Sequence, residues 1–148
     1  MDAFDADVLI FAATPGHVLG RRVRALLPHG PMGPTDPAGT GSVLLVLELL
    51  SKPLRDGATD EVDTLVEILS RLDLRPVDRS TANVATVLGA KYRLRAADAT
   101  HLASAVVVGA DRFITNNHRD FPTSIEEIDV VYAADLPDLS RPERGAGS

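Results

Sequence analysis

The chain has 148 residues, of which 45% are hydrophobic and 24% charged, values typical of a globular domain with a buried core. Its formal charge of −6 argues against a protein that coats nucleic acid through overall positive charge. The absence of cysteine excludes disulfides, thiolate nucleophiles and cysteine-ligated metals. No apolar run approaches the ~18 residues of a membrane span, and Met1–Asp7 has no basic residue. We therefore expect a cytoplasmic protein with neither a membrane segment nor a signal peptide.

The first half of the chain predicts a short strand and two helices joined by a long loop. In chain order these are a strand within Phe4–Ile10, a helix over Gly16–Leu27, a Pro- and Gly-rich loop over Pro28–Gly41, and a helix over Val43–Ser51. Ser42 is the expected N-cap of the second helix, and Pro53 is its expected stop.

The second half alternates helices with short strands. The predicted helices are Asp60–Leu72, Thr81–Lys91 and Ala97–Gly109, and the predicted strands are Leu74–Val77, Asp111–Thr115 and Ile128–Tyr132. Strands separated by helices predict a parallel sheet covered on both faces. We expect one domain over residues 1–132 and a flexible polar tail over residues 133–148.

Three carboxylates lie in runs that otherwise predict buried structure: Asp5, Glu48 and Asp98. An ionised carboxylate in apolar surroundings costs several kcal/mol unless it is paired or binds a metal. Taken singly, each has an ordinary explanation: a turn at a strand end, a partly exposed helix position and a first-turn acid, respectively. Because sites in parallel sheets form at the carboxyl ends of the strands, the three side chains are predicted to converge on one cation.

Four segments in this order resemble the PIN-domain family, in particular the VapC-type toxin ribonucleases of bacterial toxin–antitoxin pairs. They are Phe4–Ile10, Ser42 with Glu48–Leu50, Ala97–Ala103 and Gly109–Asn116. The resemblance implies a Rossmann-like three-layer α/β/α sandwich with a mostly parallel sheet. It also implies a metal-dependent endoribonuclease that leaves 5′-phosphate and 3′-hydroxyl ends. Asp5, Glu48 and Asp98 would then hold Mg²⁺ or Mn²⁺, ions that suit hard oxygen ligands. The implied partners are an RNA substrate, a small cognate antitoxin and a second copy in a homodimer.

The chain departs from the family pattern at two positions. Asn117 stands where the family often has a fourth acid, and Asp120 is a candidate to replace that acid from the following turn. Ala6 stands where a hydroxyl residue usually follows the first aspartate. These departures motivate an alternative function, a PIN-fold module that binds RNA or protein with weakened turnover. A second alternative is a phosphatase of the haloacid-dehalogenase type, which also begins with Asp-x-Asp.

Several other polar residues flank these motifs. His101 lies one helical turn after Asp98 and is expected to pack or to donate a supporting hydrogen bond, whereas Asp7 is either a supporting acid or solvated. Four arginines are candidate phosphate contacts, with a solvated surface as the equal alternative: Arg93, Arg95, Arg112 and Arg119. The remaining histidines have no ligand spacing, and with only four Phe, two Tyr and no Trp the sequence predicts no aromatic platform for bases.

Overall fold

Five short parallel strands form the centre of the computed structural model, which describes residues 1–28 and 36–139. Their order across the sheet is β3-β2-β1-β4-β5, and every neighbouring pair is parallel. The strands are β1 (Asp2–Phe4), β2 (Gly39–Ser42), β3 (Leu72–Arg75), β4 (Arg112–Thr115) and β5 (Asp129–Tyr132). Since all five run the same way, their carboxyl ends share one edge of the sheet.

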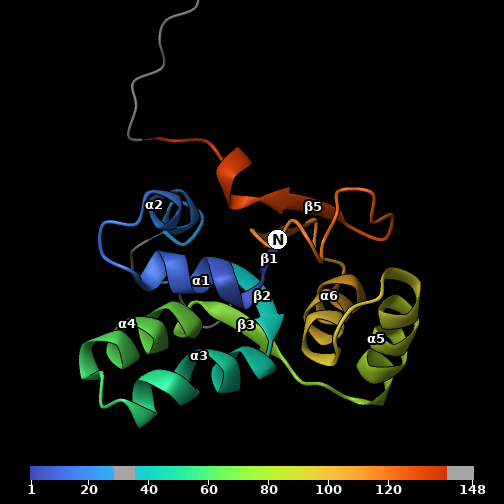
Figure 1. Ribbon diagram of the computed structural model, residues 1–148, viewed down its shortest axis with the longest axis horizontal. Helices are drawn as coiled ribbons and strands as arrows, with labels where there is room; N and C mark the ends of the chain where they lie inside the picture. The colour runs from blue at the N-terminus through green and yellow to red at the C-terminus, as the bar shows by residue number, and fades with distance from the viewer. Residues whose placement is uncertain (29–35, 140–148) are drawn as a thin grey trace, which may run out of the picture.

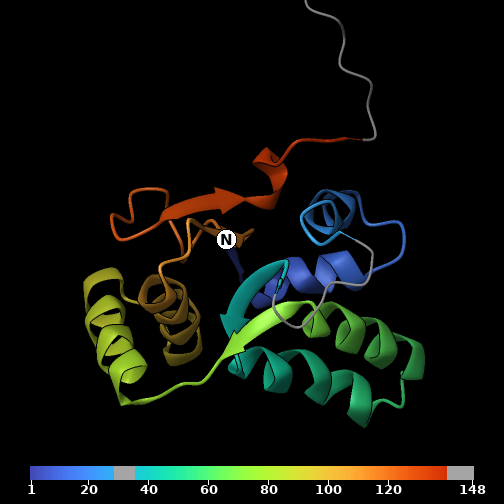
Figure 2. The same cartoon turned by 180° about the vertical axis from the view of Figure 1, so that it is seen from behind.

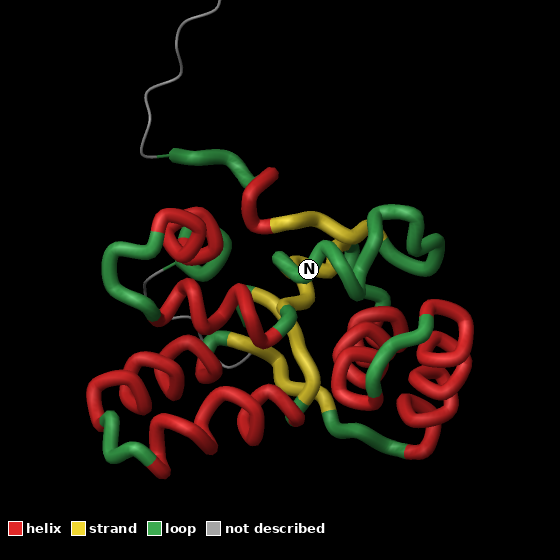
Figure 3. The backbone as a smooth tube through the Cα atoms, in the orientation of Figure 1, coloured by secondary structure: helices red, strands yellow, loops and turns green. Residues whose placement is uncertain are grey.

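Helices cover both faces of this sheet, as Figures 1 and 2 show from opposite sides. One group comprises α1 (Ala6–Ala13), α2 (Val18–Arg24), α3 (Leu44–Arg55) and α4 (Thr59–Ser70). The other comprises α5 (Arg79–Tyr92) and α6 (Ala96–Val108). Figure 3 shows the strands between the two helical layers. The predicted three-layer α/β/α sandwich is confirmed.

Adjacent residues of the strands supply two separate cores. Phe4 and Ile114 pack with the first helical group, whereas Ala3 and Phe113 pack with α5 and α6. This alternation follows from the two-residue period of a strand, which sends successive side chains to opposite faces. Both cores therefore fix the position of β1 and β4, the strands that lead into the polar residues discussed below.

Strand β2 lies partly within the segment that was predicted as a loop, and that prediction is wrong for Gly39–Gly41. The sequence Gly-Thr-Gly-Ser has no apolar alternation, so no strand pattern was visible. Its small residues are required by packing, because a Cβ at Gly39 would come within 2.5 Å of the Phe4 ring. The part of the predicted loop over residues 29–35 lies outside the described residues.

Helix α1 was also missed, because its residues continue the apolar run of β1. The strand ends at Phe4 and the helix begins at Ala6, with Asp5 as the N-cap between them. Helix α3 continues through Pro53 to Arg55, so the predicted stop is wrong. Pro53 has no N–H to donate to the Leu49 carbonyl oxygen, so the helix loses one bond of its ladder there, and the proline ring is buried instead.

The segment after β5 begins with a packed 3₁₀ turn, η1 (Ala133–Asp135). Ala133 and Leu136 are buried in the first core, and Arg22 of α2 donates to the carbonyl oxygen of Ala134. The predicted tail thus starts with ordered residues, and residues 140–148 lie outside the described part. No helix among the described residues is long and apolar enough to cross a membrane.

Candidate active site

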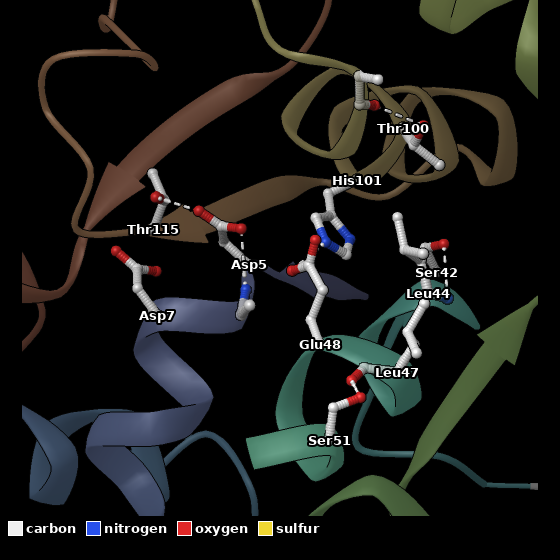
Figure 4. Close-up of polar contacts among 12 residues, drawn as sticks. Asp5, Asp7, Ser42, Leu44, Leu47, Glu48, Ser51, Thr100, His101 and Thr115 are labelled. Atoms are coloured by element: carbon white, nitrogen blue, oxygen red, sulfur yellow. Dashed lines mark hydrogen bonds and ion pairs between the residues drawn. The ribbon is translucent and has the colours of Figure 1, made fainter.

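Polar side chains gather at the carboxyl edge of the sheet, where β1 and β4 end. Asp5 and Asp7 follow β1, Thr115 ends β4, and Glu48 and His101 come from α3 and α6. Figure 4 shows Asp5 facing Thr115 and Glu48 facing His101, with Asp7 near the first pair. The expected convergence of Asp5, Glu48 and Asp98 can be followed through their contacts and mutual electrostatic effects.

Asp5 is the most buried acid of this cluster, with only 5% of its surface exposed. One carboxylate oxygen accepts the Ala6 amide at 2.8 Å, and the other accepts the Thr115 hydroxyl at 2.8 Å. Burial raises the pKa of Asp5 to about 7, and repulsion from the Asp7 carboxylate adds to the rise. Without a cation, this carboxyl group is therefore partly protonated at neutral pH.

Asp7 lies beside Asp5 in the first turn of α1. It accepts the backbone amides of Val8 at 2.7 Å and Asn116 at 3.0 Å, which ties α1 to the end of β4. Burial raises its pKa, although these hydrogen bonds and one from the Asp5 side chain oppose the rise. Asp7 thus belongs to the cluster, and the alternative of a fully solvated side chain is wrong.

Asp98 occupies the first turn of α6, whose N-cap is Arg95. Burial raises the pKa of Asp98, and the negative charges of Asp120 and Glu48 raise it further, whereas His101 and Arg95 lower it. Asp98 also contributes to the raised pKa of Asp5. These mutual effects mean that Asp98 lies within electrostatic reach of the other acids, at the positive end of the α6 dipole.

Glu48 and His101 form a contact between α3 and α6. The His101 Nε2 lies 2.9 Å from the Glu48 Oε2, with 1% of the histidine side chain and 31% of the glutamate side chain exposed. An ionised carboxylate can only accept, so the ring nitrogen donates. The prediction of a supporting hydrogen bond from His101 is consistent with this geometry, and its partner is the second of the three predicted acids.

Asn117 and Asp120 share the turn after β4. The Asn117 side-chain amide donates to Asp120 at 2.9 Å, and the Asp120 amide donates back to the Asn117 oxygen at 3.2 Å. The Asn117 backbone amide also donates to the Thr115 hydroxyl oxygen at 3.1 Å. This turn holds the Asp120 carboxylate near Asp98, and Asn117 braces it.

Thr115 is the site residue to which the sequence reasoning gave no role. Its hydroxyl is fully buried and joins the Asp5 carboxylate to the turn at Asn117. The only signal in the sequence was a hydroxyl residue as the last member of a strand, directly before two asparagines. That pattern is common at strand ends and does not by itself indicate a site.

The four candidate arginines lie in different places. Arg112 pairs with Asp2 through two contacts of 2.9 Å at the amino end of β4, the edge opposite the acids, so we leave it out of the site. Arg95 lies close enough to Asp98 to lower its pKa. Arg93, in a left-handed conformation after α5, and Arg119, in the turn before Asp120, are both exposed. The remaining candidates for phosphate contacts are Arg93, Arg95 and Arg119.

The acids of this cluster suit a hard cation that is bound through its own water molecules better than one that is enclosed by direct protein ligands. In residues 1–28 and 36–139 no three acid or histidine side chains come together as a direct metal site. Mg²⁺ keeps several of its waters and takes few protein carboxylates, so loosely spaced acids fit it through those waters. The raised pKa of Asp5 agrees with this fit, because a cation would relieve the clustered negative charge.

Comparisons with known proteins agree with the fold and identify the family. A solved structure described as a toxin–antitoxin complex from Klebsiella pneumoniae superposes with a TM-score of 0.70 and is 21% identical in sequence. The match covers 90% of this chain and 98% of that chain. No curated protein sequence matches. The family model of the PIN domain matches residues 3–123, so the chain belongs to the PIN-domain family.

Proposed function

We propose that the protein is a metal-dependent endoribonuclease that hydrolyses RNA phosphodiester bonds with Mg²⁺ or Mn²⁺. The observation that carries this proposal is the gathering of Asp5, Asp7, Asp98 and Asp120 at one sheet edge, where burial and then the charges of neighbouring acids raise the pKa of Asp5, Asp7 and Asp98. PIN domains are generally nucleases that use divalent ions, and the family match removes the haloacid-dehalogenase alternative. RNA as the substrate rests on the resemblance to toxin ribonucleases.

The proposed roles follow from the contacts of each residue. Asp5, Glu48 and Asp98 would hold the cation, with Asp120 as the fourth acid. When bound, the ion supplies a water activated at neutral pH and compensates negative charge on the phosphate. Thr115 orients Asp5, and His101 orients Glu48, through their hydrogen bonds of 2.8 and 2.9 Å. Asn117 is assigned the bracing of Asp120 in place of the direct metal contact considered from the sequence.

The decisive experiment is a ribonuclease assay with added Mg²⁺ or Mn²⁺ on mixed RNAs, compared with the same assay in EDTA. We expect cleavage only with the metal, with 5′-phosphate and 3′-hydroxyl ends on the products. Asp98→Asn should remove most of it, since the substitution deletes a charge from the cluster. The matched control is Asp63→Asn, because Asp63 lies on the exposed surface of α4. Equal activity in wild type and Asp98→Asn would refute the proposal.

A weakened binding module remains the competing function, motivated by Asn117 and Ala6. It predicts RNA or protein binding without metal-dependent cleavage. Asn117→Asp adds the missing acid beside Asp120 and gives a further comparison. If Asn117→Asp produces cleavage that the wild type lacks, the wild-type chain is the weakened module. If the wild type already cleaves, this alternative is wrong.

We further propose that the chain is the toxin of a toxin–antitoxin pair, acting in the cytoplasm as a homodimer silenced by a small antitoxin. The support is the likeness to the Klebsiella pneumoniae toxin–antitoxin complex. Expression of the chain alone should arrest growth, and co-expression of the product of an adjacent short reading frame should restore it. Sedimentation analysis measures the dimer directly. Normal growth on expression of an active nuclease would contradict the toxin role.

A further inference from the structure

The fold creates an aromatic pair that the sequence did not predict. The rings of His118 and Tyr132 stack with centroids 3.9 Å apart and planes inclined by 26°. His118 belongs to the turn after β4, and Tyr132 is the last residue of β5. Fourteen positions separate them in the chain, so no local spacing could reveal the pair.

Hydrogen bonds to the backbone hold the Tyr132 ring and the turn that carries His118. The Tyr132 hydroxyl donates to the carbonyl oxygen of Phe121 at 2.7 Å, and the His118 amide donates to the carbonyl oxygen of Asn116 at 3.1 Å. Tyr132 is half-buried, whereas His118 is exposed. His118 thus combines a ring stacked on Tyr132 with the exposure of a surface residue.

The stacked pair is linked to the acids through the end of β4 and the turn that follows it. Thr115 pairs with Tyr132 in the β4–β5 register, and adjacent strands lie about 4.8 Å apart. Thr115 donates to the Asp5 carboxylate, and His118 lies in the turn closed by the Asn117–Asp120 hydrogen bonds. A nucleotide whose base rests on His118 therefore has its phosphate near the acid cluster.

We propose that the His118–Tyr132 stack is a platform for one unpaired base of a single-stranded RNA that the acids cleave. This inference rests on the proposed ribonuclease function and names the two residues that would hold one base of its substrate. Stacking on an aromatic face is the usual way to bind splayed-out bases, and it tolerates all four bases. A base inside a duplex cannot lie on an aromatic ring, so paired RNA is a poor substrate.

The test uses single-stranded RNAs of about ten nucleotides, each with one 2-aminopurine, whose fluorescence falls when it stacks. Asp98→Asn protein with Mg²⁺ binds them without the cleavage proposed above. We expect the fluorescence to fall on binding, because the platform accepts the 2-aminopurine as it accepts any base. Adding His118→Asn should remove the quenching and weaken affinity about tenfold, the effect of losing one stacked base. His118→Phe keeps a flat ring and should retain both signals.

A second stacked pair provides a matched control. Phe11 and His17 stack with centroids 4.3 Å apart, toward the end of α1 remote from Asp5. His17 also accepts the Gly20 amide as the N-cap of α2, a contact that asparagine can replace. His17→Asn should leave quenching and affinity unchanged. Equal losses in His17→Asn and His118→Asn would overturn the platform, because the effect would then be general.

Two results separate the platform from the proposed function. If the wild-type chain cleaves RNA with metal while His118→Asn alters neither quenching nor affinity, the platform is wrong and the nuclease stands. If the wild-type chain neither binds nor cleaves any RNA, the proposed function fails, and the platform fails with it. Equal cleavage of single-stranded and fully paired RNA would also overturn the platform, because a paired base cannot stack on His118.

Discussion

Replacing Asp5 by asparagine should stabilise the metal-free protein at neutral and alkaline pH. Burial raises the pKa of this carboxyl group from its ordinary 3.8 to about 7 in the folded protein. The folded state therefore holds a proton that the unfolded state has already lost between these two values, so stability falls as the pH rises through this range. The difference corresponds to a penalty on the order of 4 kcal/mol above pH 7.

The variant should escape this penalty, because an amide remains neutral at every pH. Asparagine is also as good an N-cap as aspartate, so the start of α1 should survive. Urea denaturation in EDTA from pH 5 to pH 9 measures the effect. The free energy of unfolding should decline with pH more steeply in wild type than in Asp5→Asn, and by pH 8 the variant should be more stable.

Two results of the same urea denaturation would contradict the prediction. If the two pH profiles run parallel, or if Asp5→Asn is less stable than wild type at pH 8, the argument from burial is wrong. Asp63→Asn, which removes an exposed carboxylate, should give the wild-type profile. Adding Mg²⁺ at a hundred times its dissociation constant should stabilise the wild type by about 2.7 kcal/mol, the value for a ligand specific to the folded state. It should stabilise Asp5→Asn by less.

Three further changes test the packing and the site. Phe113→Ala empties a fully buried position and should cost about 3–5 kcal/mol in urea denaturation, and a loss below 1 kcal/mol would contradict the close packing. Gly20→Ala would place a Cβ 2.0 Å from the Phe11 carbonyl oxygen, so α2 must shift and the melting temperature should fall; an unchanged value would count against this contact. His101→Phe keeps the bulk but removes the donor to Glu48, so calorimetry should report Mn²⁺ binding weakened about tenfold. Unchanged Mn²⁺ binding would mean that this hydrogen bond does not position the glutamate.

The sequence predicted the fold through its long amphipathic segments and through the order of its motifs. The helix predicted over Asp60–Leu72 is observed as Thr59–Ser70, since its apolar residues recur at helical spacing. Strand β2 was not predicted because packing against Phe4 requires glycine at Gly39. A glycine contributes nothing to the apolar alternation from which strands are predicted. Helix α1 was not predicted because Val8–Ala13 are all apolar, so no helical period was visible.

The sequence drew attention to the acids of the candidate site, whereas it gave no sign of the contacts that support them. Asp5, Glu48 and Asp98 stood out because a carboxylate is unusual within an apolar run. Their partners Thr115 and His101 are ordinary members of a strand and a helix, and only the folded chain brings them to Asp5 and Glu48. The same holds for the stacked rings of His118 and Tyr132, which meet across two strand ends.

Each successive residue at the end of β1 has a different buried environment, so none can be exchanged with its neighbour. Ala3 belongs to one core, Phe4 to the other, and Asp5 points into the acid cluster directly after them. Inserting or deleting one residue here would exchange the two cores and turn the carboxylate away from Thr115. In an insertion-scanning library, this stretch should be among the least tolerant of the protein, and folding and catalysis should be lost together.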